Sequence, residues 1–368
     1  MANALQEITV RNWNRAVPMS ALFELTFVCN HACSFCYNCP TGQKEMNTAE
    51  VFDALRKLAD FNVLYLTLTG GEPLVRRDFF EIAAEARRLG FALRIYTNGY
   101  LIDEAMAKKI KQIANPLEME ISIHGAKPET HDKLTCVPGS LQRVINAVKH
   151  LRAQGIKLNL KCPITRDNQA EVLDLHKLAR ELGVTIIFDP VITPRDDGDK
   201  DPLSLMATDE FLKSYWSDPA YAAARMEPVP APRSDAPGEA VCGTGRSSFA
   251  IDPYGSIYPC VQWRRKVANI KEVTSLKEVW HTSPVLIEVR QTAVEMADKL
   301  RDMHQEGKSG GFCNFCLGVA DLQTGDPKGY YPQAAKNAEY RKQAYETWKE
   351  TTGETLEDNG GILSKCSM

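Results

Sequence analysis

The sequence has no long apolar run and no strong excess of charge of one sign. The first twenty residues lack the apolar core of a secretory signal peptide, and no later apolar stretch is long enough to cross a bilayer. The 44 Lys and Arg residues nearly balance the 47 Asp and Glu residues, and both signs are spread along the chain. This balance does not indicate a nucleic-acid or membrane surface. We therefore expect a cytoplasmic protein with neither nucleic acid nor membrane as a partner.

Cysteine is the residue type that stands out, with 11 among 368 residues. An odd number with several close spacings does not fit the disulfide framework of a small secreted protein and favours metal binding in a reducing compartment. The length is sufficient for one large α/β domain and a smaller module.

Short apolar runs alternate with helical patterns in the first half of the chain, which predicts βα units and a parallel sheet. The six predicted strands are 21–28, 63–69, 91–97, 117–123, 156–163 and 184–190. Helices are predicted between them because apolar residues recur at intervals of three and four, at 49–60, 79–89, 103–114, 141–154 and 170–182. The expected fold is α/β, a partial (β/α)6 TIM-like barrel.

Three cysteines, Cys29, Cys33 and Cys36, lie within eight residues directly after the first predicted strand. Thiolates are the usual protein ligands of iron–sulfur clusters, and three of them on one loop can hold three irons of a [4Fe–4S] cube. The fourth iron then has no protein ligand and can bind a small molecule, so the loop indicates a reactive cluster. The alternative is a buried or zinc-bound cysteine trio.

Further motifs follow the next three strands. Gly70-Gly71-Glu72-Pro73 follows the second strand, Thr97-Asn98-Gly99 the third, and Ser122 and His124 the fourth. In folds of this kind, ligands collect at the carboxyl ends of the strands. Paired glycines let the backbone approach a ligand closely, and Glu72 offers a carboxylate. Each motif alone is more often only a tight turn. Its position close after the cysteines is what indicates a ligand site.

Together, the cysteine loop, the Gly-Gly-Glu-Pro turn and the strand spacing resemble those of radical S-adenosylmethionine (SAM) enzymes. The resemblance implies that Cys29, Cys33 and Cys36 hold a [4Fe–4S] cluster whose open iron binds SAM. Reductive cleavage of SAM would then yield a 5′-deoxyadenosyl radical that abstracts hydrogen from an unactivated carbon. This chemistry implies a low-potential reductant such as ferredoxin or flavodoxin as a partner.

The same resemblance implies a set of contacts to SAM, namely Phe35, Tyr37, Gly70, Gly71, Glu72, Pro73, Thr97, Asn98, Ser122 and Asn168. The two aromatic residues would lie near the adenine, although aromatic rings beside a cluster are also typical of packing. The Gly-Gly-Glu segment would contact the methionine amino group. Asn168 either binds the ribose or caps the helix that follows it.

A second set of cysteines lies in the C-terminal half: Cys242, Cys260, Cys313 and Cys316. Residues 252–255 predict a turn and 256–259 a short strand, so a β-hairpin would present Cys260 toward Cys242. Alone, this set fits structural zinc as well as iron. Its spacing, with Gly255 before Cys260, resembles the Twitch module, a shortened SPASM domain. That resemblance implies a second, auxiliary [4Fe–4S] cluster whose four protein ligands suit it to conducting an electron.

These patterns divide the chain into five predicted segments: an N-terminal extension (1–20), a radical SAM partial barrel (21–195), a linker (196–241), a small cysteine-rich Twitch/SPASM-like domain (242–320) and a C-terminal helical extension (321–368). The linker contains the proline-rich stretch 228–237. The acidic stretch 193–200 is interpreted as a solvated loop. A helix is expected at 334–349.

Four cysteines remain outside both sets: Cys39, Cys136, Cys162 and Cys366. Cys162 at the end of the fifth strand and Cys136 in a loop are candidate hydrogen donors to a product radical. The alternative for each is a small packing residue. His124 and His131 are either proton acceptors in an oxidative reaction or structural residues.

Three hypotheses for the function remain. Radical SAM enzymes with Twitch or SPASM modules commonly crosslink or epimerise ribosomally made peptides, so peptide modification is the first. The residues before Ala21 are too few for a peptide-recognition domain, so a separate protein would supply one. The second hypothesis is radical dehydrogenation or epimerisation of an aminosugar or another small natural-product intermediate. The third is a non-enzymatic electron carrier with two clusters, which predicts no cleavage of SAM.

Overall fold

The computed structural model describes residues 4–227, 229–233 and 238–355. Pro228 and Pro237, the ends of the predicted proline-rich stretch, and Cys366 lie outside the described residues.

One nine-stranded sheet forms the frame of the molecule, in the order β6-β5-β4-β3-β2-β1-β7-β8-β9. The first six strands run parallel and are β1 (Ser20–Thr26), β2 (Tyr65–Gly70), β3 (Ala92–Thr97), β4 (Glu118–Ser122), β5 (Leu158–Pro163) and β6 (Thr185–Asp189). The first and last residues of each of these six strands lie within two residues of their predicted positions. The prediction of a partial βα barrel is confirmed.

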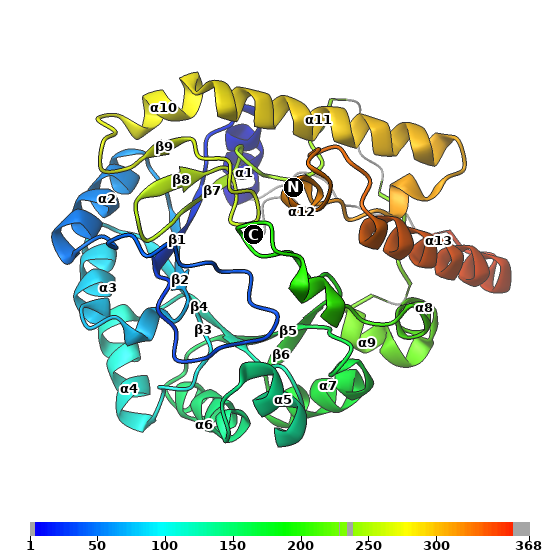
Figure 1. Cartoon of the computed structure of the whole chain (residues 1–368), viewed down its shortest axis with the longest axis horizontal. Coiled ribbons are helices and arrows are strands. Elements are labelled where there is room, and N and C mark those ends of the chain that lie inside the picture. Colours follow the sequence, from blue (N-terminus) through cyan, green and yellow to red (C-terminus); the bar gives the residue numbers. More distant parts are fainter. Residues whose placement is uncertain (1–3, 228, 234–237, 356–368) are drawn as a thin grey trace.

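Helices cover the outer face of this curved sheet (Figure 1). They are α2 (Thr48–Asp60), α3 (Phe79–Arg88), α4 (Glu104–Lys109) with a following π-turn (Ile110–Ala114), α5 (Pro128–Thr135), α6 (Ser140–Ala153) and α7 (Val172–Glu181). The short helix α5 was not predicted, because few of its residues are apolar.

Alternate strand residues separate the two faces of the sheet. Ile121 and Leu160 are fully buried in the main core between the strands and the helices. Their neighbours Glu120 and Lys161 are only partly buried. Because successive side chains of a strand point to opposite faces, these charged residues face the concave interior. The interior of the partial barrel is therefore polar.

The C-terminal part continues the same sheet. Strand β7 (Ser248–Ile251) pairs parallel with β1, and β8 (Ser256–Tyr258) and β9 (Ala268–Asn269) follow in antiparallel order. The predicted hairpin at 252–259 is confirmed. Helices α10 (Leu276–Thr282) and α11 (Pro284–Gln305) run along the side that the βα units leave open (Figure 1).

The segment predicted as a linker contains two helices, α8 (Asp209–Ser217) and α9 (Ala222–Arg225). Trp216 of α8 lies in the main core, and its indole N–H donates to Asn337 Oδ1 at 2.9 Å. Asn337 belongs to α13 (Pro332–Thr352), the helix predicted at 334–349. The described part of this segment therefore contains folded structure. The predicted domain boundaries stay predictions.

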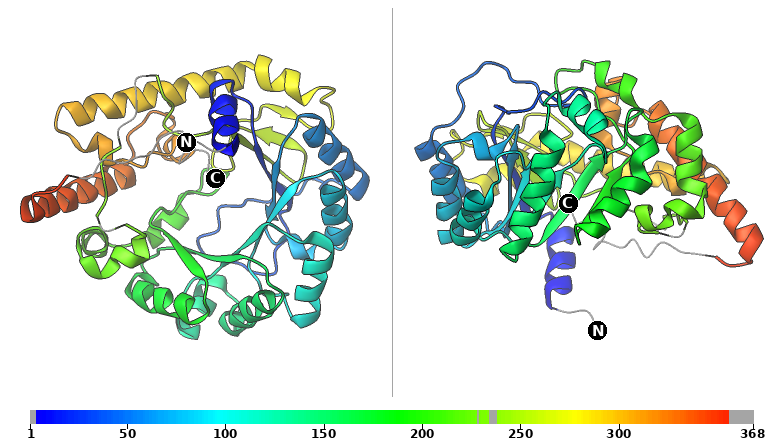
Figure 2. Two further views of the ribbon diagram at one scale, coloured as in Figure 1. Left: turned by 180° about the vertical axis from the view of Figure 1, so that it is seen from behind. Right: turned by 90° about the horizontal axis from the view of Figure 1, so that it is seen from below.

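The N-terminal helix α1 (Ala4–Asn14) extends away from the body on the side opposite the loop that follows β1 (Figure 2). Its Trp13 is 3% exposed and lies in a second apolar core with Val289 of α11 and Leu317 of α12 (Leu317–Thr324). None of the described helices combines the length and the apolar character needed to span a membrane.

Candidate functional site

The loop with the first three cysteines leaves β1 at the carboxyl edge of the sheet. Backbone N–H groups of Ala32 and Ser34 donate to the carbonyls of Thr135 and Leu134 at 3.2 and 3.1 Å. Cys36 N–H donates to the Cys33 carbonyl at 3.0 Å and closes a turn. These bonds fix the cysteine loop against the C-terminal end of α5.

The three thiols lie close enough together to affect one another electrostatically. The pKa of the Cys33 thiol is raised to about 12. Burial is the largest cause, and the charges of Cys36 and Cys29 also contribute to the increase. Burial likewise raises the pKa values of Cys29 and Cys36. Thiolates crowded in this way need a nearby positive charge, and an iron centre supplies it. The chemistry of this donor set therefore fits an iron–sulfur cluster.

Two glycines let the end of β2 pack directly on the chain that leads into Cys29. A Cβ at Gly70, whose φ is +138°, would lie 2.1 Å from the Thr26 carbonyl oxygen. One at Gly71 would lie 2.6 Å from the Val28 carbonyl oxygen. Gly71 N–H instead donates to Thr26 O at 2.7 Å. The close approach that these glycines allow is here between two strand ends, and their approach to a ligand stays a prediction.

Glu72 is fully buried and connects β2 to the end of β3. Its carboxylate accepts hydrogen bonds from Leu74 N–H at 3.0 Å, Asn98 N–H at 2.7 Å and the Thr97 hydroxyl at 2.9 Å. Burial raises the pKa of Glu72 to about 7, although these hydrogen bonds lower it. Pro73 begins the 3-10 turn Pro73–Val75 that follows. Glu72 thus holds the loop after β3 in place through hydrogen bonds to Thr97 and Asn98.

Asn98 brings the end of β3 to the cysteine loop. Its amide Nδ2 lies 2.7 Å from Asn30 Oδ1 and 3.8 Å from Cys29 Sγ. Its Oδ1 accepts from Tyr100 N–H at 3.0 Å. Thr97 and Asn98 therefore lie beside the predicted cluster ligands, as their place in the strand order implies.

The aromatic residues of the cysteine loop have different surroundings. The Phe35 ring meets the His124 ring edge-on with centroids 4.8 Å apart, and His124 stacks on His131 at 5.5 Å. His131 Nδ1 accepts from His124 N–H at 3.0 Å. Burial lowers the pKa of both histidines, so they are neutral. Tyr37 is partly buried, and its backbone carbonyl accepts a hydrogen bond from Asp196 N–H at 2.9 Å.

Ser122 ends β4 on the polar, concave side of the sheet. Asn168 does not cap the helix that follows it. Asn168 is fully buried, and its amide donates to the carbonyls of His124 and Pro163 at 3.0 and 2.9 Å. Its Oδ1 accepts from Thr165 N–H at 2.7 Å. With these atoms engaged, the side chain does not cap the next turn, and its contact with the ribose stays a prediction. It joins the loops after β4 and β5.

The two candidate hydrogen donors lie in contrasting places. Cys162 is fully buried in the core between sheet and helices, with Sγ 3.6 Å from Asn168 Nδ2. It lies on the same face of β5 as Leu160, away from the concave interior. This burial does not favour a hydrogen-donor role for Cys162, which stays a prediction. Cys136 is exposed at the C-terminal cap of α5, with φ +58°, and its charge affects the Cys33 thiol. Its role stays a prediction.

The second cysteine set lies around the second apolar core, which contains Cys313 and is contacted by Cys242, Cys260 and Cys316. Burial raises the pKa of Cys316 to about 12, with added contributions from Cys260 and Cys242. Among the side chains that the structure describes, no group of three possible ligands converges closely enough for a single metal ion. A [4Fe–4S] cube binds each thiolate at a different iron and is compatible with wider spacing than one tetrahedral zinc.

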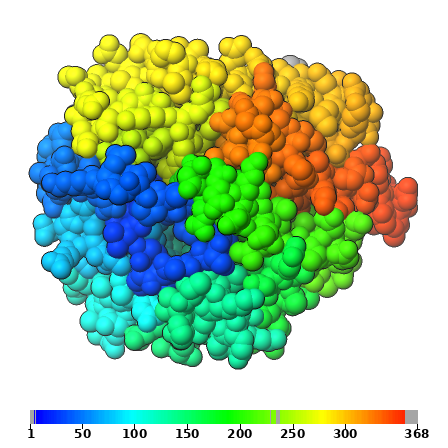
Figure 3. Space-filling model, in the orientation of Figure 1, coloured from blue at the N-terminus to red at the C-terminus, as the bar shows by residue number. Residues whose placement is uncertain are grey.

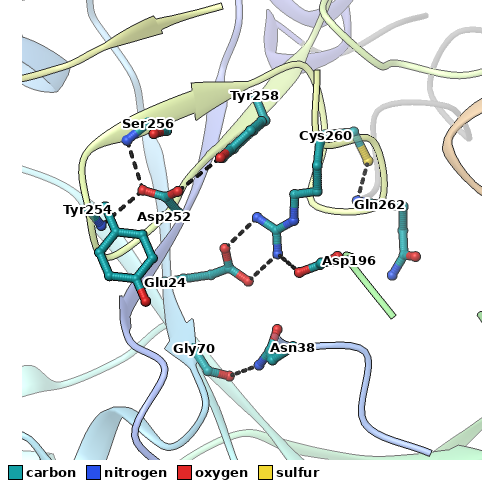
Figure 4. Close-up of polar contacts among 11 residues, drawn as sticks. Glu24, Asn38, Gly70, Asp196, Asp252, Tyr254, Ser256, Tyr258, Cys260 and Gln262 are labelled. Carbon is teal, nitrogen blue, oxygen red and sulfur yellow. Dashed lines mark hydrogen bonds and ion pairs between the residues drawn. The ribbon is translucent and has the colours of Figure 1, made fainter. Parts of the chain in front are cut away.

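A buried ion-pair network that includes Glu24 and Asp196 lies near Cys260 of the second cysteine set (Figure 4). Arg264 Nη1 and Nη2 donate to the Glu24 carboxylate at 2.7 and 2.9 Å, and Nη2 lies 2.9 Å from Asp196 Oδ2. The Asp196 side chain is only 14% exposed, so the interpretation of 193–200 as a solvated loop is wrong at this residue. Sequence analysis missed this network because 240 residues separate Glu24 from Arg264.

The face with the cysteine loop is hollowed. Figure 3 shows a recess bordered by the loop after β1 and by the segment after β6. The residues at the ends of β1 to β4 described above lie on this side of the sheet. The recess therefore gives access to the candidate site.

Comparisons with known proteins agree with this arrangement. Residues 23–179 match the model of the radical SAM superfamily, and residues 242–316 match the SPASM model, an iron–sulfur cluster-binding domain. The chain is 25% identical to the AdoMet-dependent heme synthase of Methanosarcina barkeri over 84% of this chain and 94% of that protein. It is 27% identical to the PqqA peptide cyclase of Gluconobacter oxydans over 82% of this chain and 87% of that protein.

A solved structure supports the fold. The match to the structure of anSMEcpe with bound AdoMet spans 95% of this chain and 98% of that protein, with a TM-score of 0.66 and 18% sequence identity. The matched relatives are enzymes, so the hypothesis of a non-enzymatic electron carrier is wrong. The two domain types imply [4Fe–4S] clusters and SAM as cofactors. The chain is an enzyme of the radical SAM superfamily, with a SPASM-type iron–sulfur domain after its partial barrel.

Proposed function

We propose that this enzyme modifies a ribosomally made peptide by crosslinking or epimerisation. The observation that carries the proposal is its similarity to a PqqA peptide cyclase over most of both chains. The recess on the face with the cysteine loop is compatible with a peptide that reaches the site (Figure 3).

In this proposal Cys29, Cys33 and Cys36 hold the SAM-binding cluster. Cluster and SAM together supply, when bound, a 5′-deoxyadenosyl radical that can remove hydrogen from an unactivated carbon. The carbonyls of Thr135 and Leu134 hold the cysteine loop in place, and Asn98 lies against it. The chain thus orients the loop that would hold the cluster.

Cys242, Cys260, Cys313 and Cys316 are proposed to hold the auxiliary cluster. Four protein thiolates would leave no open iron, so this site suits electron transfer better than substrate binding. A ferredoxin or flavodoxin is the proposed reductant, and a separate peptide-recognition protein is a further proposed partner.

A second candidate is radical dehydrogenation or epimerisation of a small natural-product intermediate. The similarity to a heme synthase, which spans 94% of that protein, favours it. The two functions differ in substrate and use the same cysteine sets.

The test starts with anaerobic reconstitution of the full chain. We expect about eight irons per chain and release of 5′-deoxyadenosine with SAM and a reductant. Replacing Cys29, Cys33 and Cys36 by Ala should abolish that release, and release that persists would contradict the proposed ligands.

Substrate class needs a separate measurement. A short peptide encoded beside the gene should lose two hydrogen atoms on crosslinking, or gain deuterium from heavy water on epimerisation, as detected by mass spectrometry. An unchanged peptide, together with turnover of a small-molecule intermediate from the same gene neighbourhood, would favour the second candidate.

A further inference from the structure

Arg264, in the cysteine-rich C-terminal part, makes largely buried ion pairs with Glu24 and Asp196, which are labelled in Figure 4. Its side chain is 11% exposed and that of Glu24 is 1% exposed. The two form a bidentate pair, and Asp196 adds a second carboxylate to the same guanidinium. Bidentate charged pairs are among the strongest hydrogen-bonded contacts, and burial limits screening by salt.

On the barrel side, this network is tied to the first cysteine loop. Asp196 N–H donates to the carbonyl of Tyr37 at 2.9 Å, and Arg195 Nη1 donates to the carbonyl of Cys36 at 3.3 Å. Glu24 lies on β1, the strand that leads to the same loop. Both carboxylates that hold Arg264 therefore belong to segments in contact with, or continuous with, the proposed SAM-cluster loop.

On the auxiliary side, Arg264 follows a tight turn that begins at Cys260. Cys260 and Trp263 form an isolated β-bridge, and Gln262 N–H lies 3.4 Å from Cys260 Sγ. The Tyr258 ring lies 5.2 Å from the guanidinium carbon, and its hydroxyl donates to Asp252 at 3.0 Å. The direction of Arg264 is thus fixed by the same turn that places Cys260.

The charges of the network reach both cysteine sets. Burial is the largest influence on Cys36 and raises its pKa, and the charges of Asp196 and Glu24 add to the increase. Burial also raises the pKa of Cys260, while the charge of Arg264 lowers it. Glu24 and Asp196 therefore act on a proposed ligand of the first cluster, and Arg264 acts on one of the second. The guanidinium is in direct contact with both carboxylates.

We propose that Arg264 is a positioning residue that fixes the Cys260 turn against the Cys36 loop. We further propose that the charge of Arg264 and the charge of Glu24 have opposite effects on the reduction potential of each cluster. This inference rests on the proposed cluster ligands. Reduction adds negative charge to a cluster, so a nearby positive charge favours the reduced form and a nearby negative charge disfavours it. Arg264 raises both potentials, and Glu24 lowers them.

The test compares four variants of the reconstituted full-length enzyme: Arg264→Gln, Glu24→Gln, the double variant and Arg265→Gln. Arg265 is a matched control because it makes a bidentate pair with Glu288 at 2.9 and 2.7 Å, with side chains 30% and 59% exposed. Midpoint potentials are followed by electron paramagnetic resonance. We expect Arg264→Gln to lower them, Glu24→Gln to raise them, the double variant to lie near wild type, and Arg265→Gln to have no effect.

Hydrogen exchange measures the positioning role separately. In Arg264→Gln, the amides of 193–200 and of Tyr37 and Asn38 should exchange faster, whereas in Arg265→Gln they should not. Arg264→Lys keeps the charge but not the bidentate geometry, so it should retain the potentials while exchange rises. If Arg264→Gln does not fold, Arg264→Lys and Glu24→Gln still provide both readouts.

The outcomes separate two kinds of failure. Shifts of the same sign in Arg264→Gln and Glu24→Gln, or unshifted potentials with about eight irons bound, would overturn the role of Arg264 alone. About four irons in the wild-type enzyme would overturn the proposed auxiliary ligands, and with them this inference.

Discussion

Glu72 illustrates how a single residue of a motif acts in this fold. Its carboxylate has no exposed surface, and it accepts hydrogen bonds from the chain after β2 and from the loop after β3. The resemblance to radical SAM enzymes implied that Glu72 contacts the cofactor. The structure shows that its oxygens are already engaged in joining two strand ends beside the cysteine loop.

The titration of Glu72 gives a measurable pH dependence. Its pKa rises from 4.5 to about 7 on folding, so between these pH values the folded state keeps a proton that the unfolded state loses. Its contribution to the free energy of unfolding is therefore greatest below pH 4.5 and falls by about 3 kcal/mol as pH rises to about 7. Glu72→Gln cannot titrate, so denaturant unfolding between about pH 5 and pH 7.5 should show a smaller decrease. Parallel curves for the two proteins would contradict this.

Cys162 should prove dispensable for the reaction. Cys162→Ala removes a thiol buried between sheet and helices, so we expect a loss of about 1–2 kcal/mol in stability and release of 5′-deoxyadenosine within about twofold of wild type. Stability is measured by thermal unfolding. Cys29→Ala is the control that should lose activity, and a Cys162→Ala enzyme that folds normally but makes no product would support the hydrogen-donor hypothesis.

At the scale of elements, the contact between the ends of β1 and β2 places the cysteine loop. The two chains approach so closely at Gly70 and Gly71 that a side chain at either would collide with backbone atoms. Backbone atoms cannot move aside as the end of a flexible side chain can. The position of Cys29 therefore depends on the absence of side chains on the neighbouring strand.

Gly71→Ala should displace the cysteine loop. Its Cβ would lie 2.6 and 2.7 Å from the Val28 and Phe27 carbonyl oxygens, so the strand ends must separate. We expect a loss of more than about 100-fold in 5′-deoxyadenosine release, because small displacements of reacting groups are costly. Gly155→Ala, at a helix end with open space around it, should cost about 1 kcal/mol of stability and leave the release rate unchanged. Equal rates for the two variants would contradict this.

The repeated βα elements could be predicted because each follows from local pattern. Strands such as β3 and β4 are apolar on the face that packs against helices, and their bounds differ little from prediction. Helix α8 was missed because its burial depends on α13: Trp216 finds its hydrogen-bond partner 121 residues away. A contact between residues this far apart in the sequence cannot be predicted from a short sequence pattern.

At the scale of the whole molecule, the SPASM-type part is continuous with the barrel through the pairing of β7 with β1. The N-terminal helix adds a second connection, since Trp13 lies in the apolar core around the second cysteine set. Trp280 of α10 adds a third, donating to the Ala16 carbonyl at 2.6 Å. These contacts favour a single unit over two loosely tethered domains.

Trp13→Ala should destabilise the C-terminal part. Removing a buried indole typically costs about 3–5 kcal/mol, and here it would leave a cavity beside Val289 and Leu317. We expect a lower free energy of unfolding and faster hydrogen exchange in α11 and α12. Ile8→Ala on the same helix is the control, because Ile8 is 39% exposed and should change stability little. Similar effects of the two substitutions would contradict the proposed packing role.

The candidate site was predictable where its residues are close in sequence. The spacing of Cys29, Cys33 and Cys36 alone indicated a cluster loop. The contact of Arg264 with Glu24 and Asp196 was not predictable, because it depends on how β7 and β8 extend the sheet beyond β1.

The shared edge of β1 and β7 has a consequence for exchanging modules between related enzymes. If only the C-terminal half were replaced by that of a related enzyme, the foreign strand at the position of β7 would have to pair in parallel with the original β1. That β1 strand was selected to pair with a different β7. Chimeras should therefore succeed when the donor contributes its own first strand together with its auxiliary half.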